Sequence, residues 1–330
     1  MIFRRTSANA SAPGKIIFFG EHFVIYNNLA ILGSINRRIR VAVSLNNDPD
    51  RCINIRSDLG VAASYSASSH ANVIREGKDM DINLEPIYKI AKDILSEREQ
   101  NAGIDIYLVS EVPYGVGLGS SAASCVATGA AIDALFHSPD KNWLYNKATE
   151  YEQLIHKDSS GADCFISTFG GLRYYMKEKG FENIQLEKDL TLLVVNTGIR
   201  HSTGTLVSLV RRFKENNLSI FEDLVSTAAH ICSSALTAFR TGNETKLGTL
   251  MNENHQLLQK IGVSHKKIDY LVEVCIKSGA LGAKLTGAGG GGCIITLVRN
   301  NELLDVSSKI EKDAREFMPI KIDYDGLLVD

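Results

Sequence analysis

The chain has 330 residues, of which 44% are hydrophobic and 22% are charged, and its formal net charge is −2. This composition is typical of a soluble globular protein with a sizeable core, and the length favours two domains. Because charges of both signs are well mixed, we expect neither nucleic acid nor a membrane surface as a partner. There is no signal peptide and no apolar run of the ~20 residues that a membrane span needs, so we expect a cytoplasmic protein.

The first half of the chain mixes predicted strands and helices. Residues 39–45 alternate apolar and polar side chains, as a half-buried strand does, whereas the apolar residues of 87–95 recur at helical spacing. A loop is expected at 158–163, leading into a strand that ends at Gly170 and Gly171. In chain order, strands are predicted at 15–19, 30–32, 39–45 and 104–112, and helices at 87–95, 121–135 and 142–157.

The second half is predicted to be mainly helical. The helices are expected at 206–213, 220–239, 247–261 and 268–278, and short buried strands at 192–195 and 293–298. We place a domain boundary between residues 170 and 190. The prediction is an N-terminal domain of residues 1–175 and a C-terminal domain of residues 176–330.

A glycine-rich segment, Pro113 to Ala123, joins a predicted strand to a predicted helix. Its glycines at alternate positions let the backbone approach a ligand closely and adopt positive φ. The following helix offers unpaired N–H groups and the positive end of its dipole. This combination predicts a phosphate site, with a tight structural turn as the alternative. No G-x-x-x-x-G-K-[ST] sequence occurs, so the loop is not a Walker A motif.

A second glycine-rich segment runs from Gly287 to Gly292. It matches G-x-G-x-x-G, but the residues that follow it favour a strand, whereas a dinucleotide fingerprint requires a helix there. We therefore reject the fingerprint. The segment is predicted to form a flexible backbone wall against a second part of the ligand, and a structural hairpin loop is the alternative.

Three segments together resemble the GHMP kinases, a superfamily that includes galactokinase, homoserine kinase, mevalonate kinase and phosphomevalonate kinase. They are Ser11 to Tyr26, Pro113 to Ala123 and Lys284 to Cys293, in the order and at the separations usual for the family. The resemblance covers essentially the whole chain. It implies a two-domain α+β fold, with an N-terminal domain like ribosomal protein S5 that contains a left-handed βαβ unit, and a ferredoxin-like C-terminal domain.

Within this superfamily, the chain is most similar to the mevalonate kinases. The similarity lies in Gly20 to Tyr26, Glu152 to Asp163, and Asn196 to Thr203. It implies transfer of the γ-phosphoryl group of ATP to the 5-hydroxyl of mevalonate, a step towards isoprenoids. We expect the departures from the pattern to affect substrate selectivity more than the chemistry. They are Asn27 in place of Gly, Ser159 in place of Pro and His201 in place of Arg.

The resemblance also implies how ATP and its metal are bound. The first glycine-rich loop and the start of the next helix would hold the phosphates, and the Ser121 hydroxyl and Glu152 carboxylate would hold Mg²⁺, which prefers hard oxygen ligands. A helix cap for Ser121 and a solvated helix face for Glu152 are the alternatives. The implied ATP-binding residues are Pro113, Gly115, Gly117, Leu118, Gly119, Ser120, Ser121 and Ala122.

Asp163 and Lys15 are the implied catalytic residues. Asp163 would accept the proton of the acceptor hydroxyl, and Lys15 would lie beside both the aspartate and the transferred phosphoryl group. In an alternative reading, Asp163 only orients Lys15. The residues implied to bind the acceptor are Glu21, His22, Thr203, Gly287 and Ala288.

The sequence is also compatible with other activities. Phosphomevalonate kinase would need extra basic residues around a phosphorylated acceptor, and Arg200 is the one evident candidate. Diphosphomevalonate decarboxylase fits the first motif less well. A catalytically silent metabolite sensor would be expected to lose the lysine, the base or a metal ligand, all of which are present. The sequence does not give the oligomeric state, for which we expect a homodimer, or the adenine contacts, for which Arg56 to Asp58 are candidates.

Overall fold

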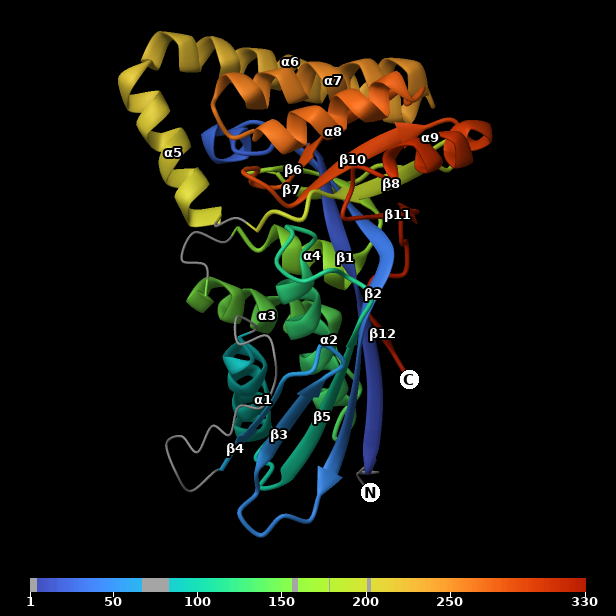
Figure 1. Ribbon diagram of the computed structural model, residues 1–330. Coiled ribbons are helices and arrows are strands. Elements are labelled where there is room, and N and C mark those ends of the chain that lie inside the picture. Colours follow the sequence, from blue (N-terminus) through green and yellow to red (C-terminus); the bar gives the residue numbers. More distant parts are fainter. Residues whose placement is uncertain (1–4, 67–82, 156–159, 178, 201–202) are drawn as a thin grey trace.

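The computed structural model describes residues 5–66, 83–155, 160–177, 179–200 and 203–330 (Figure 1). Its first sheet is built around two long antiparallel strands, β1 (Ser7–Phe19) and β2 (Ala30–Asn46), which run through much of the molecule. The further strands of this sheet are β3 (Ile53–Ser57), β4 (Ala62–Tyr65), β5 (Gly103–Ser110), β6 (Leu172–Met176), β7 (Gly180–Asn183) and β12 (Leu328–Val329).

The order of strands in this sheet is β12-β1-β2-β5-β3-β4, and β6 and β7 continue it from the other end of β2. Strands β3 and β5 are parallel, and the helix α1 (Glu85–Glu97) lies between them in sequence, which gives a βαβ unit. At the opposite edge, β12 returns from the end of the chain and pairs with β1 through Ala10 and Val329. The first and last parts of the chain therefore share one sheet.

Four helices cover one face of the first sheet: α1, α2 (Ser120–Ala134), α3 (Lys141–Ile155) and α4 (Ala162–Phe169) (Figure 1). Helix α2 is the central one and packs against β1, β2 and all three other helices. Its sequence is rich in alanine and has little polar surface, as a helix buried on all sides requires. The start of α2 is thereby fixed against β1.

The second sheet has the antiparallel order β11-β8-β10-β9. Two of its strands flank the helices α5 to α8 in sequence, and α9 precedes the last strand, so the pattern is βαββαβ with ferredoxin-like order, as expected. The elements are β8 (Thr191–Asn196), α5 (Thr203–Asn216), α6 (Leu218–Arg240), α7 (Glu244–Lys260), α8 (Lys266–Lys277), β9 (Gly282–Thr286), β10 (Cys293–Val298), α9 (Leu303–Ile310) and β11 (Glu316–Ile320).

A continuous hydrophobic core joins the two halves. Phe18 and Phe19, at the end of β1, are fully buried and meet the ring of Phe239 in α6 edge-on, with centroids 5.2 and 6.3 Å apart. Asn28 also donates a hydrogen bond to the Val225 carbonyl of α6, at 2.9 Å. The chain just after β1 is therefore held between the two halves. In the ranges described, no helix is both long and apolar enough to cross a membrane.

Three expectations differ from the structure. The strand expected to end at Gly170 and Gly171 is wrong, because Ala162–Phe169 forms the helix α4. The strands expected at 30–32 and 39–45 are parts of the single strand β2. The strand expected at 15–19 is the last part of the longer strand β1, which begins at Ser7.

Candidate active site

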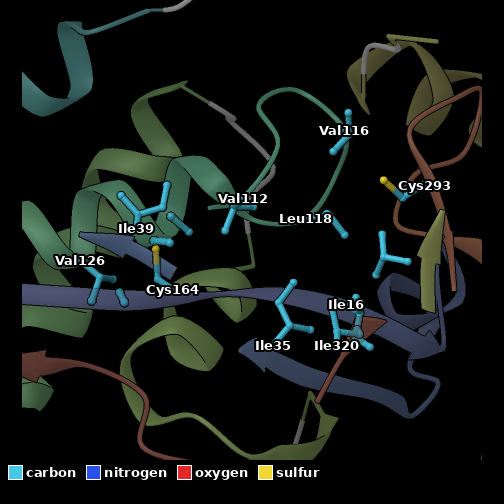
Figure 2. Packing of buried hydrophobic residues seen from close by; sticks show 14 of the residues in the cluster. Ile16, Ile35, Ile39, Val112, Val116, Leu118, Val126, Cys164, Cys293 and Ile320 are labelled. Atoms are coloured by element: carbon cyan, nitrogen blue, oxygen red, sulfur yellow. The ribbon is translucent and has the colours of Figure 1, made fainter. Parts of the chain in front are cut away.

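The first glycine-rich loop, between β5 and α2, lies directly against β1. The Lys15 amide donates a hydrogen bond to the Leu118 carbonyl at 2.8 Å. A Cβ atom on Gly14 would lie 2.8 Å from that carbonyl oxygen, and one on Gly119 would lie 2.7 Å from Lys15 Cγ, so neither position has room for a side chain. Figure 2 shows Val112 and Leu118 of this segment facing β1. This packing brings the loop to Lys15.

The loop ends in an uncapped helix. Gly115, Gly117 and Gly119 have φ of 75°, 84° and 74°, a region that L side chains rarely adopt. Gly119 is the N-cap residue of α2, and no described side chain caps the helix, so the N–H groups of its first turn point outward without side-chain partners. With the positive end of the dipole, these groups suit an anion such as a phosphate.

Lys15 and Asp163 form an ion pair beside this loop. Lys15 lies in β1 and is 5% exposed, and its Nζ is 3.2 Å from Oδ2 of Asp163. Asp163 lies in the first turn of α4, where the helix dipole favours a carboxylate, and its side chain is 29% exposed. The structure thus brings together a nearly buried cation and an accessible carboxylate, which sequence motifs almost 150 residues apart had singled out.

The second glycine-rich loop faces the first. It joins β9 to β10, and a Cβ on Gly287 would lie 3.6 Å from the Gly117 carbonyl oxygen. Hydrogen bonds from Gly290 N to Val263 O at 2.7 Å and from Gly292 N to Ile199 O at 2.8 Å hold it in place. Both loops therefore approach the same space, one from each half of the molecule.

Glu21 and His22 follow β1 and contact the second half. Glu21 forms an ion pair with Lys284 of β9, and both side chains are almost completely buried. Burial raises the pKa of Glu21, against the opposing effects of Lys284 and, less strongly, of Lys15, and burial lowers the pKa of Lys284. The Nε2 atom of His22 is 2.8 Å from the Ala288 carbonyl, and burial lowers the pKa of this imidazole.

Ser121 and Glu152 come from the adjacent helices α2 and α3. Glu152 is 5% exposed, and one of its oxygens accepts a hydrogen bond from the Cys164 thiol at 3.3 Å. In the described ranges no group of three or more His, Cys, Asp or Glu side chains could hold a metal. A hydroxyl and one carboxylate still suit Mg²⁺, because this ion keeps several waters and is bound partly by substrate phosphates.

Some predicted residues are not joined to this cluster by any contact between described residues. Thr203 is exposed at the start of α5, and its role stays a prediction. Ser159 and His201, where the chain departs from the family pattern, lie outside the described residues. Lys284 and Thr286 were missed as site residues, although both lie in the third motif. Thr286 Oγ1 accepts a hydrogen bond from Ile17 N at 2.8 Å, which links β9 to β1.

Comparison with known proteins gives a consistent result. Residues 85–171 match the GHMP kinases N terminal domain, and residues 235–315 match GHMP kinases C terminal. The chain is 34% identical over 329 residues to a mevalonate kinase of Pyrococcus abyssi, covering 97% of each chain, and 36% identical over 294 residues to that of Archaeoglobus fulgidus, covering 89% of this chain and 93% of that one. It also resembles the crystal structure of L. major mevalonate kinase in complex with R-mevalonate, with a TM-score of 0.83, 26% identity, and 98% and 99% of the two chains covered.

Proposed function

This chain belongs to the GHMP kinase family, and from that premise we propose that it transfers the γ-phosphoryl group of ATP to the 5-hydroxyl of mevalonate. The family and the mevalonate kinase relatives together make the chain an ATP-dependent kinase of a small molecule. The observation that carries the proposed chemistry is the Lys15–Asp163 ion pair, at 3.2 Å, beside the uncapped start of α2. The acceptor is supported by the similarity to mevalonate kinases over nearly the full chain.

The proposed reaction forms a bond between the acceptor oxygen and the γ-phosphorus and breaks the bond from that phosphorus to the ADP oxygen. The proton of the hydroxyl passes to the Asp163 carboxylate. Lys15 offsets the negative charge of the transferred group, in a nearly buried position where its field is weakly screened. The backbone N–H groups of the glycine-rich loop and of α2 hold the other phosphates. The products are 5-phosphomevalonate and ADP.

A divalent cation completes the proposal. The Ser121 hydroxyl and the Glu152 carboxylate would hold Mg²⁺, which neutralises phosphate charge when bound. Glu152 is buried, and its carboxylate lies against α4, where the Cys164 thiol donates to it. The homodimer and the cytoplasmic location stay predictions.

The test is an assay of ADP release by the purified chain with four separate acceptors: mevalonate, phosphomevalonate, homoserine and galactose. We expect release with mevalonate, with 5-phosphomevalonate as the second product by mass spectrometry. We also expect EDTA to abolish the activity and added Mg²⁺ to restore it. Clear activity with another acceptor, and none with mevalonate, would refute the proposed acceptor.

A further inference from the structure

The ion pair between Lys284 and Glu21 is the most deeply buried one in the described part of the chain. The Lys284 side chain is 0% exposed and that of Glu21 is 1% exposed, and the two residues come from opposite halves of the molecule. Lys284 also donates a hydrogen bond to the Leu285 carbonyl at 2.6 Å. Charges without solvent are stable only when paired, so each of these two side chains depends on the other.

Three residues at alternate positions along β9 and the loop after it, Lys284, Thr286 and Ala288, contact the end of β1 and the residues that follow it. Thr286 Oγ1 bonds the backbone of Ile17, and the Ala288 carbonyl accepts from His22. Alternate residues of a strand lie on one face, so the face of β9 that carries Lys284 and Thr286 meets the end of β1, and the loop after β9 adds the contact from Ala288 to His22. The second half of the molecule thus holds the end of β1 at three successive points.

The segment held in this way has an unusual backbone. His22 has φ of 60°, a strained conformation for a residue other than glycine. Gly20 has φ of 95°, and a Cβ there would lie 2.6 Å from Ala30 Cα. Strained conformations persist only where the surroundings enforce them. The contacts from Lys284 and Ala288 hold this conformation from the second half of the molecule, in addition to the local backbone hydrogen bonds from Phe23 to Glu21 and from Val24 to Gly20.

The Glu21 carboxylate has almost no access to solvent. Its Oε1 is taken by Lys284, and its Oε2 is buried with no hydrogen-bond partner among the described residues. The neighbouring His22 is half-buried and donates from Nε2 to Ala288, which leaves Nδ1 as an acceptor for a hydroxyl group. His22 is therefore the side chain of this segment that can reach a ligand.

We propose that Lys284 is a positioning residue for the phosphoryl acceptor, acting through Glu21, and that Glu21 serves in this buried pair and does not bind the acceptor itself. Lys284 holds Glu21, and Glu21 fixes the backbone that carries His22. Lys284 also neutralises a carboxylate that would otherwise compete with Asp163 for Lys15. This inference rests on the proposed kinase function and changes the role expected for Glu21.

The test is a double-mutant cycle with Lys284→Met, Glu21→Gln and the double variant. Lys284→Met leaves a buried carboxylate without its cation. We expect the KM for mevalonate to rise and kcat to fall, so that kcat/KM falls by up to about 100-fold, as for other small displacements at an active site. The KM for ATP should change little. The double variant has no buried charge and should recover most of the loss, because the two changes act on one unit.

A direct contact between Glu21 and the acceptor predicts a different result. In that case the losses from the two single variants multiply, and the double variant is the worst of the three, which would overturn the proposal. If Lys284→Met does not fold, the activities of Glu21→Gln and of the double variant are compared instead. A direct contact between Glu21 and the acceptor predicts that adding Lys284→Met to Glu21→Gln lowers the activity further, whereas the proposal predicts that it does not. Ile310→Ala, a buried change in α9, is the control for reduced stability with unchanged KM.

The wild-type assay keeps this proposal separate from the proposed function. If the wild-type chain phosphorylates another acceptor, the cycle is measured with that acceptor. Losses that multiply in the double-mutant cycle would then contradict only the role proposed for Lys284. A wild-type chain that is inactive with mevalonate would contradict only the proposed substrate.

Discussion

Asp163 is the residue on which the proposed chemistry depends most directly. It pairs with Lys15, which has little access to water, so replacement by Asn removes a proton acceptor and leaves a buried cation without its partner. For Asp163→Asn we expect kcat to fall by about 10²–10⁴-fold, the usual contribution of a general base. The KM for ATP should change little, because the glycine-rich loop is untouched. Steady-state ADP release measures both.

The matched control is Asp305→Asn. Asp305 also lies in the first turn of an eight-residue helix, α9, but it is exposed and far from the site. It should leave turnover unchanged. If Asp163→Asn also kept the turnover of the wild type, the carboxylate would not be the proton acceptor.

His255 gives a prediction about pH. Its Nε2 is 3.2 Å from Asp269, yet burial lowers its pKa from 6.5 to about 4. Between about pH 6.5 and pH 4, the His255 imidazole is therefore protonated in the unfolded chain and neutral in the folded chain. The stability of the fold is therefore unaffected by this group above pH 6.5, and it decreases as the pH falls from 6.5 towards 4 because protonation favours the unfolded chain. Between pH 7 and pH 5 we expect the free energy of unfolding to fall by about 2 kcal/mol through this group.

Urea denaturation of the wild type and of His255→Gln measures this effect. Carboxylates such as Glu111, whose pKa is lowered overall although burial opposes it, also destabilise the fold in acid, so the difference between the two proteins isolates the histidine. The difference should shrink as the pH falls. Parallel pH curves for the two proteins would contradict the prediction.

The residues of the candidate site could be predicted where they lie in contiguous motifs, and so could the pairing of Lys15 with Asp163, but other partners could not. Lys15, Asp163 and the two glycine-rich loops stand in recognisable local patterns. The pairing of Glu21 with Lys284 joins residues 263 positions apart, and nothing in either local pattern indicates the other. Such a pair is fixed by the packing of the two halves, which a single sequence does not specify.

At the scale of elements, α4 shows how tertiary contacts override local preference. Its residues Cys164 to Phe169 include aromatic and β-branched types that favour a strand. In the structure this segment packs against α2, α3 and β1, and glycines with positive φ, Gly161 and Gly170, stand at its two ends. The consequence reaches the site, because Asp163 gains a helix dipole that a loop would not provide.

The start of α2 provides a prediction at this scale. Gly119→Ala places a methyl group against Lys15 in a left-handed conformation, which by itself costs roughly 1–2 kcal/mol. We expect a further effect on activity, because Lys15 and the helix terminus must shift apart, and kcat should fall by at least about tenfold. Kinetics and thermal unfolding of the purified variants measure the two effects.

Gly60→Ala is the matched control. Gly60 has a similar φ of 77°, but a Cβ there meets nothing within 4 Å, and it lies in the turn between β3 and β4. This variant should lose stability to a similar extent with unchanged kcat. Equal kinetic effects of the two variants would show that strain alone, and not contact with Lys15, matters.

At the scale of the whole molecule, the end of the chain stabilises its beginning. Arg38 of β2 forms a buried ion pair with Asp323 and donates to the carbonyls of Ser11 and Gly326, at 2.8 and 2.5 Å. Asp323→Asn leaves a buried guanidinium without its counter-charge. We expect the free energy of unfolding to fall by about 3–5 kcal/mol, as for other broken buried pairs.

Urea denaturation tests this expectation, with Glu85→Gln as the control. Glu85 pairs with Lys89 on the exposed face of α1, and the loss of such a pair costs less than about 1 kcal/mol. Equal losses for the two variants would mean that the buried pair has no special role in joining the chain ends.

The return of β12 to the edge of β1 sets an order for biosynthesis. Residues 191–320, which form the whole second sheet with its helices, are translated before β12 exists. Until Leu328 and Val329 have been made, Ala10 and Ser11 at the outer edge of β1 lack the strand that pairs with them in the fold, and open strand edges invite pairing with other chains. This part of β1 therefore waits for its partner while the residues up to 327 are made, and chaperones that bind extended segments can reach it during that time.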